Sequence, residues 1–286
     1  MANLKEIRSR ISSVGSTMQI TSAMKMVSAA KLKKAQDAIT AMRPYSDKLT
    51  ELLQQLSATL DGDSGSIFAE KREVNKVLIV AITSNRGLCG AFNSNIIKES
   101  LRLRHEQYAG KEVSFVTVGK KGNDILKKTE NVILYNNGVF DDLNFENASE
   151  IAEELMKYYV EGKFDKIVLV YNSFRNAATQ IVEAEDFLPI SSKEEETVTA
   201  KDYIFEPSKE EIVKTLIPKS LKTQLFKALR DSFASEHGAR MTAMHKATDN
   251  AKDLKAELTL TYNKARQAAI TNEILEIVGG AEALNA

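Results

Sequence analysis

Apolar residues near the N-terminus recur at alternating steps of three and four. The first positions of this series are Leu4, Ile7, Ile11, Val14 and Met18. This spacing predicts one side of a two-stranded coiled coil, because it places the residues on one helical face. The step then changes to Ile20, Met24 and Val27, which predicts that the apolar stripe rotates around the helix.

The C-terminal region shows a similar spacing. Its apolar and small residues are Leu254, Leu258, Thr261, Ala265 and Ala268, continued loosely by Leu275 and Val278. Residues 219–278 contain no proline and only Gly238, which favours a continuous helix. A helix over about 209–280 would be on the order of 105 Å long at about 1.5 Å per residue. The simplest partner for it is the N-terminal helix, antiparallel, with the tip of the longer helix projecting alone.

The middle of the chain has a different pattern, with apolar runs separated by amphipathic stretches. The expected strands are 76–83, 112–119, 131–135, 166–172 and 179–190, and the expected helices are 92–108, 123–129 and 147–161. We expect Asn147 to cap the last helix, with Glu150 three residues further on. Strands that are apolar on both faces and alternate with helices predict an α/β fold with a mostly parallel, Rossmann-like sheet. The expected division is 1–60 and 208–286 as coiled-coil helices, and 74–192 as the α/β domain.

Charge and composition argue against some classes of binding partner. The 286 residues include 39 Lys and Arg against 39 Asp and Glu, so the whole chain has no net attraction to nucleic acid or an anionic membrane. The distribution is uneven, however. Residues 1–34 hold seven basic residues and one acid, and residues 183–196 hold six acids and one lysine. Both stretches suit either a charged partner surface or a solvated face.

The single cysteine, Cys89, excludes an intrachain disulfide and a cysteine-rich zinc site. It favours a reducing compartment. No apolar run approaches the roughly 20 residues of a membrane span, and the first ten residues lack the apolar core of a secretory signal. We therefore expect any membrane association to be indirect.

The loop SNRGLCGAFN (84–93) is the natural place to look for a nucleotide, because it joins a strand to a helix. Its glycines, Gly87 and Gly90, do not form GxGxxG, and no GK[ST] follows. A tight turn that needs glycine backbone freedom explains them better. Cys89 has no histidine nearby in sequence, and His237 and His245 are eight residues apart, so neither a nucleophile nor a metal pair is expected.

Three segments together resemble one family. They are IRSRISSVGSTMQITSAMKMVSAAKL (7–32), SNRGLCGAFN (84–93), and SEHGARMTAMHKATDNA (235–251) with ITNEILEIVGGAEA (270–283). They are similar to the gamma-subunit family of F-type ATP synthases, in its bacterial form. The most specific match is Ile270, Thr271, Glu273, Glu276, Gly280 and Ala281, in the order I-T-x-E-x-x-E-x-x-x-G-A.

The resemblance implies a function that periodicity alone does not. Members of this family form the central rotor shaft, which stands inside a hexamer of three alpha and three beta subunits. The other end contacts the epsilon subunit and the membrane c-ring, on the cytoplasmic side. Proton-driven rotation then changes the conformation of the catalytic beta sites. The implied chain has no catalytic site, no cofactor and no nucleic-acid partner, and it reaches the membrane only through the c-ring.

Five positions match residues through which the family contacts the beta subunit. They are Met24, Arg240, Gln267, Thr271 and Glu273. The resemblance gives Arg240 a beta carboxylate as its partner, and a guanidinium suits that role because its hydrogen bonds are directional. The alternatives are a solvated arginine and, for Met24, a methionine that fills a gap in the helix seam.

The loop departs from the family pattern at Asn85, where aspartate is frequent, and at Ala91, where glycine is common. One cysteine also means that the paired cysteines of the chloroplast form are missing. Two other function classes stay open on the residues alone: an α/β enzyme that binds a nucleotide, and a coiled-coil scaffold or nucleic-acid-binding protein. The missing phosphate motif weakens the first, and the absence of aromatics in residues 1–34 weakens the second.

Overall fold

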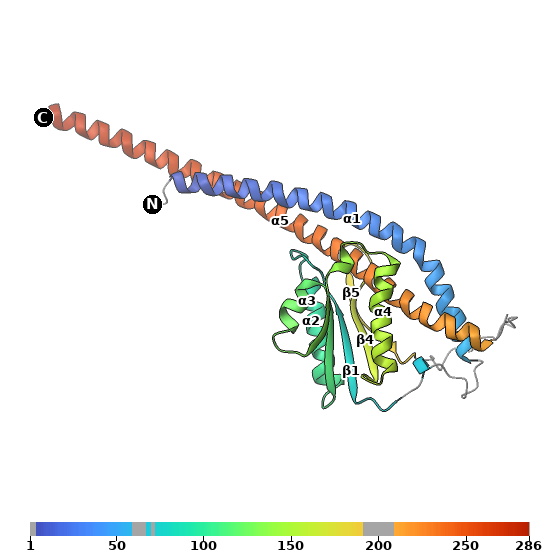
Figure 1. Ribbon diagram of the computed structural model, residues 1–286. Coiled ribbons are helices and arrows are strands. Elements are labelled where there is room, and N and C mark those ends of the chain that lie inside the picture. The colour runs from blue at the N-terminus through green and yellow to red at the C-terminus, as the bar shows by residue number, and fades with distance from the viewer. Residues whose placement is uncertain (1–3, 59–66, 70–71, 191–208, 286) are drawn as a thin grey trace. The chain divides into compact units, whose positions relative to one another are not determined.

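The computed structural model describes residues 4–58, 67–69, 72–190 and 209–285 (Figure 1). These residues form two compact units. One contains residues 1–28 and 241–286, and the other contains residues 29–240. Helix α1 (Leu4–Ala58) and helix α5 (Lys209–Asn285) each contribute to both units. The long terminal helices predicted from the breaker-free sequence are therefore confirmed.

In the first unit, α1 and α5 run antiparallel. The hydroxyl of Thr248 donates to that of Thr21 at 2.8 Å, and Lys25 lies 3.4 Å from His245. From Thr21 to Lys25 the residue numbers on α1 rise, while those of their partners on α5 fall from Thr248 to His245. The two helices are therefore antiparallel. The predicted seam is confirmed at its start, where Ile7 is buried and Met18 is half-buried.

The predicted rotation of the apolar stripe is confirmed, because the apolar residues after Met18 leave the face that packs on α5. Ile20 and Val27 are 60% and 58% exposed, whereas the seam continues in the same register through polar side chains. These side chains are Thr21, Lys25 and Ser28. Burial of Thr21 and Ser28 costs little here, because their hydroxyls also donate to main-chain carbonyls one turn earlier.

On α5, by contrast, the seam is displaced from the predicted one. Leu258 and Ala265 are half-buried as expected, but Leu254 and Thr261 are exposed. The facing positions are instead Met244, Thr248, Ala251, Lys255, Leu258, Tyr262 and Ala265. Their steps of three and four keep one face toward α1. From 266 to 281 every side chain is exposed.

The second unit contains a five-stranded sheet. Its strands are β1 (Lys76–Ile82), β2 (Glu112–Val118), β3 (Val132–Asn136), β4 (Lys166–Phe174) and β5 (Gln180–Leu188). Their order is β3-β2-β1-β4-β5, with parallel pairing except at the antiparallel edge strand β5. In register, Leu78 of β1 lies between Ser114 of β2 and Ile167 of β4. The mostly parallel α/β sheet is confirmed.

Helices cover both faces of this sheet (Figure 1). Helix α2 (Phe92–Arg102), the π-helix η2 (Leu103–Gln107) and helix α3 (Lys120–Leu126) pack on one face. Helix α4 (Phe145–Val160) and residues 217–229 of α5 pack on the other. Short 3-10 turns lie at Ile67–Ala69 (η1) and Gly138–Phe140 (η3). The strand residues alternate between the two clusters, so β1 is buried on both sides.

One predicted cap is wrong. Helix α4 begins earlier than expected, and its N-cap is Asn144, whose side chain accepts a hydrogen bond from the backbone N–H of Asn147 at 2.8 Å. Asn147 is thus the third residue inside the helix, and its own amide donates to Asp142. Both asparagines fit a cap by type, and only the turn before the helix distinguishes them.

Candidate functional site

Arg240 of α5 lies against the loop between β1 and α2. Its side chain is 6% exposed. The Nε atom donates to the carbonyl of Gly87 at 3.2 Å, and Nη2 donates to the carbonyl of Arg86 at 3.1 Å. Nη2 also lies 2.6 Å from Oε1 of Glu236. The guanidinium therefore holds the loop through main-chain oxygens while Glu236 balances its charge.

The loop itself is a tight turn with an internal hydrogen-bond network. Leu88 and Gly90 have φ values of 63° and 60°, so the expected glycine freedom applies to Gly90. Gly87 is outside the left-handed region, and Leu88 has that conformation instead. The side chain of Asn93 accepts from the backbone N–H of Ser84 at 2.9 Å and donates to Sγ of Cys89 at 3.3 Å. This network joins the two ends of the turn.

Cys89 is 2% exposed. Burial raises the pKa of its thiol, and the Ser84 hydroxyl and Arg240 only partly oppose this. Because the thiolate is the reactive form of cysteine, a buried thiol with a raised pKa is a poor nucleophile. Cys89 is a packing residue of the loop.

His237 and Glu236 complete this buried cluster. Burial, together with the charges of Arg240 and Lys31, lowers the pKa of His237 to about 4. Its ring meets Phe233 edge-on at 4.5 Å between centroids, and Nδ1 lies 3.4 Å from Nη1 of Arg240. Burial raises the pKa of Glu236, against the effect of Arg240. At neutral pH the imidazole is thus neutral and the ion pair is confined to Glu236 and Arg240.

Residues 226–233 of α5 also contact a second loop, the one that precedes α4. Arg230 donates to the carbonyl of Leu143 at 2.7 Å and lies over the ring of Phe226, while Phe233 stacks on Phe140. Asn85 joins the two loops, because its amide donates to the carbonyl of Asn137 at 2.7 Å. The carboxyl edge of the sheet, where a parallel sheet would bind a nucleotide, is therefore fastened to α5.

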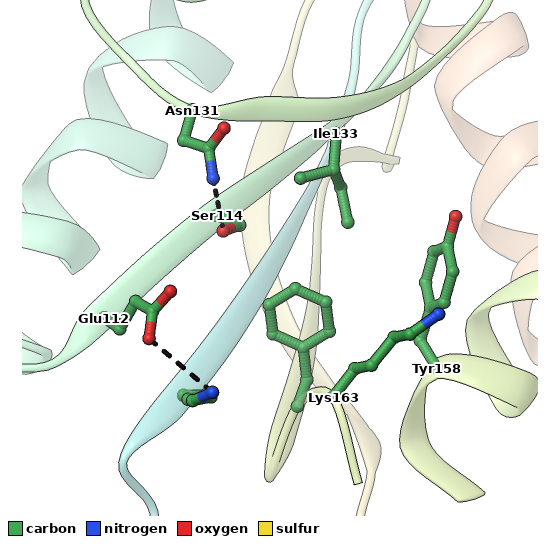
Figure 2. A pocket seen from close by; sticks show the side chains of 8 residues that line it. Glu112, Ser114, Asn131, Ile133, Tyr158 and Lys163 are labelled. Carbon is green, nitrogen blue, oxygen red and sulfur yellow. Dashed lines mark hydrogen bonds and ion pairs between the residues drawn. The ribbon is translucent and has the colours of Figure 1, made fainter. Parts of the chain in front are cut away.

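A hollow of about 380 Å³ lies at the opposite edge of the sheet (Figure 2). Among its lining residues are Glu112, Ser114, Asn131 and Lys163. The amide of Asn131 donates to the Ser114 hydroxyl at 3.0 Å, and Lys163 pairs with Glu161 at 2.8 Å. These polar groups are thus paired with other side chains of the chain, and the hollow lies at the amino ends of the strands. Nucleotides bind at the carboxyl ends, so this hollow gives no support to a nucleotide site.

The other residues matched by the family resemblance lie in the first unit. Met24 is half-buried, next to Met26, which is 66% exposed. Gln267, Thr271 and Glu273 are exposed, and the Thr271 hydroxyl donates to the carbonyl of Gln267 at 3.0 Å. The structure thus gives the five residues two different settings: four are open or half-open, and Arg240 is buried among contacts of its own chain.

Sequence reasoning missed the partners of Arg240 within the chain. Glu236 and His237 stand four and three residues before it, a spacing that places all three on one helical face. The sequence SEHGAR (235–240) therefore shows that these three side chains share a face, but it does not show that the carbonyls of Arg86 and Gly87 face Arg240. Of the acidic stretch 183–196, Glu183 and Glu185 lie half-buried on β5, whereas 194–196 lie outside the described residues.

Two kinds of feature are absent from the residues that the structure describes. Among them, no group of three or more His, Cys, Asp or Glu is placed to hold a metal ion. Within the same residues, no helix has the length and apolarity to cross a bilayer.

The chain is similar to known proteins over nearly its whole length. The family profile described as ATP synthase matches residues 3–284. The chain is 71% identical to the ATP synthase gamma chain of Flavobacterium johnsoniae over 286 residues, and 54% identical to that of Cytophaga hutchinsonii over 294 aligned positions, with all of each chain covered.

Among solved structures, the chain is similar to one from Tetrahymena thermophila, titled mitochondrial ATP synthase central stalk and c-ring. The identity is 25% and the TM-score 0.60, over 80% of this chain and 99% of that one. A chain of the Euglena gracilis mitochondrial ATP synthase, at 21% identity and TM-score 0.71 over 98% and 94% of the two chains, shares the fold.

Proposed function

The chain belongs to the ATP synthase gamma-chain family, and from this we propose that it is the central rotor shaft of an F-type ATP synthase. The observation that carries the proposal is the identity of 71% to a gamma chain over the full length of both proteins. In this role the helices α1 and α5 turn inside a ring of three alpha and three beta subunits. The epsilon subunit and the c-ring bind the other end and supply the torque.

The exposed apolar residues of the first unit support such a contact surface. Ile20, Met26 and Val27 on α1 are 58–66% exposed, and Ile274, Leu275 and Ile277 on α5 are 54–68% exposed. They lie outside the seam between the two helices, so pairing within the chain leaves them free for another protein. Exposed groups of large apolar side chains are typical of protein interaction sites.

Within this surface, we propose that Met24, Gln267, Thr271 and Glu273 contact the beta subunit. For Arg240, the proposed contact with a beta carboxylate has to compete with Glu236 and the loop carbonyls, which already occupy its donors. The proposed divisions at 1–60, 74–192 and 208–286 follow from the same scheme, with the α/β domain between two helical arms.

We also propose that the chain has no catalytic site of its own. The buried Cys89 and the neutral, buried His237 are unsuited to nucleophilic or acid–base work at neutral pH. The proposed location is the cytoplasmic face of the cell membrane, where the chain would be attached peripherally through the c-ring.

A reconstitution experiment tests this function. The purified chain alone should not hydrolyse ATP. Mixed with alpha and beta subunits of the same enzyme, it should form an active complex with a ratio of three to three to one. Tight ATP binding by the isolated chain, or a complex of another ratio, would contradict the rotor assignment.

Rotation itself can be observed with a bead attached to the chain. Cys89 is buried, so a cysteine introduced at the exposed position Lys98 on α2 (Lys98→Cys) should react selectively. ATP should then turn the bead in complexes fixed to a surface by their beta subunits. The unsubstituted chain is the control for labelling, and a bead that does not turn in hydrolysing complexes would exclude a rotor.

A further inference from the structure

One nitrogen of His245 lies between two groups of opposite charge. His245 is on α5 in the first unit, opposite Lys25 of α1. Its Nδ1 atom is 3.4 Å from Nζ of Lys25 and 3.3 Å from Oδ2 of Asp249, which stands one turn further along α5. The first contact joins the two helices, whereas the second stays within α5.

This nitrogen can make only one of the two hydrogen bonds at a time. The ammonium group of Lys25 is a donor only, and the carboxylate of Asp249 is an acceptor only. An unprotonated Nδ1 can accept from Lys25, and a protonated Nδ1 can donate to Asp249. The proton on Nδ1 therefore decides whether His245 bonds to α1 or to its own helix.

Proton uptake by the imidazole also changes the charge balance of the contact. Lys25 from α1 and Asp249 from α5 are the charged groups that the described residues place against the ring. With a neutral ring, these two charges cancel. With a protonated ring, Nδ1 can no longer accept, and two cations face each other across the seam. Both changes weaken the contact between the helices.

Lys25 stands in a polar part of the seam. Its neighbours in the seam on α1 are Thr21 and Ser28, and the Thr248 hydroxyl of α5 donates to that of Thr21 at 2.8 Å. A hydrogen bond between uncharged groups contributes modestly to stability. The contact of Lys25 with His245 is therefore a substantial part of the interaction between the helices at this level.

We propose that His245 is a proton-sensitive link between α1 and α5 in the first unit. In its neutral form the imidazole accepts a hydrogen bond from Lys25 and ties the two helices together. In its protonated form it donates to Asp249 and repels Lys25, so the seam loosens when the pH falls. Both contacts lie within the chain, so the link operates in the isolated protein and does not depend on the proposed rotor function.

The effect of the link is local and modest. The side chains of His245 and Asp249 are 56% and 60% exposed, so solvent screens their charges. Exposed charge contacts of this kind change a local opening equilibrium by about two- to fivefold. The change should therefore be sought in the seam near Lys25 and in the imidazole itself.

The position of the proton on His245 can be observed directly. The chain has three histidines, so nitrogen-15 NMR of histidine-labelled protein gives few signals, and the variant His245→Gln assigns those of His245. At about pH 8, the upper end of the usual range of histidine protonation, Nδ1 should carry no proton. Lys25→Met removes the donor and should move the proton to Nδ1, where it meets Asp249. Lys34→Met, at an exposed position on the same helix, should leave the proton in place.

Hydrogen exchange of the full-length chain tests the effect on the seam. Corrected for intrinsic rates, the amides of residues 21–28 should exchange about two- to fivefold faster at about pH 5 than at about pH 8. The pKa of His237 is about 4, so this ring contributes little in that range. His245→Gln, whose side-chain oxygen can accept from Lys25 at either pH, should show no such difference. His105→Gln, at an exposed position on η2, should behave like the wild type.

Three results would overturn the proposal. A proton on Nδ1 of His245 in the wild type at about pH 8 would mean that the imidazole does not accept from Lys25. An unchanged proton position in Lys25→Met would mean that the lysine does not decide it. Exchange of residues 21–28 that is independent of pH, or that depends on pH equally in the wild type and in His245→Gln, would exclude His245 as the link.

Discussion

Two stretches of helix α5 use similar residues in opposite ways. Between 217 and 240 nearly every side chain is buried or half-buried, and Leu225 and Leu229 are fully covered. Between 266 and 281 every side chain is exposed, although this stretch includes Ile274, Leu275, Ile277 and Val278 at 50–68% exposure. One helix therefore contains a core segment and an uncovered apolar segment.

The two stretches show that apolar residues have two different roles in one helix. In the first stretch, leucines pack on the sheet and α4 and so stabilise the fold. In the second, no described residue of its unit covers the apolar side chains, and the proposed function gives them another protein to contact. The same substitution should therefore lower the stability of the chain in the first stretch and weaken assembly with other subunits in the second. The expected effects differ most in the unfolding free energy of the isolated chain.

The largest change is expected for Arg240→Ala. It removes the anchor of the β1–α2 loop and leaves Glu236 buried without its partner, which costs about 3–5 kcal/mol. Urea unfolding measures the loss, and thiol labelling of Cys89 should become faster because the loop is released. Arg266→Ala, in the exposed stretch, is the matched control and should change stability by less than about 0.5 kcal/mol. Equal effects of the two would contradict an anchoring role for Arg240.

The direct comparison is Leu229→Ala against Leu275→Ala. Leu229 is fully buried, so its truncation leaves a cavity and should cost about 2–5 kcal/mol. Leu275 is 63% exposed, and its truncation should change the unfolding free energy by less than about 0.5 kcal/mol. Leu275→Ala should instead weaken assembly with alpha and beta subunits. A large loss of stability at Leu275 would mean that the exposed stretch is covered within the chain.

The third prediction concerns the loss of stability at acidic pH. The folded-state pKa of His237 is depressed to about 4 from an ordinary 6.5, so the unfolded chain binds a proton first as the pH falls. Stability should therefore decrease between pH 6.5 and about 4, by about 2 kcal/mol after allowance for partial solvent screening. In His237→Gln this decrease should be smaller, whereas His245→Gln, at an exposed site, should retain it. The midpoint of thermal unfolding across this pH range measures both.

The smallest effect on stability is expected for Met24→Lys. Met24 is half-buried in the first unit, so a flexible lysine should cost less than about 1 kcal/mol. Under the proposed function, it places a cation where α1 passes the beta subunit, and protons pumped per ATP should fall more than complex formation does. Ser9→Lys, an exposed position on the same helix, controls for the added charge. Unchanged pumping per ATP would argue against a beta contact at Met24.

Local patterns determined most of the elements. The strands β1, β2 and β4 were predicted within two residues, because apolar runs of β-branched residues between turns have few alternatives. The seam of α1 from Leu4 to Met18 followed from its spacing, and Leu258 and Ala265 were placed correctly on α5. Such features depend on a few neighbouring residues, so the sequence alone is sufficient.

The tertiary structure decided which polar residues are inside. Thr21, Lys25 and Ser28 keep the seam only because α5 offers Thr248 and His245 opposite Thr21 and Lys25. Arg240 is buried because a loop about 150 residues earlier turns its carbonyls toward it. Glu183 and Glu185 are half-buried because Tyr171 of β4 and Gln224 of α5 offer them hydrogen-bond donors. Burial of a polar group depends on a distant partner for its hydrogen bond or charge, and no local spacing specifies that partner.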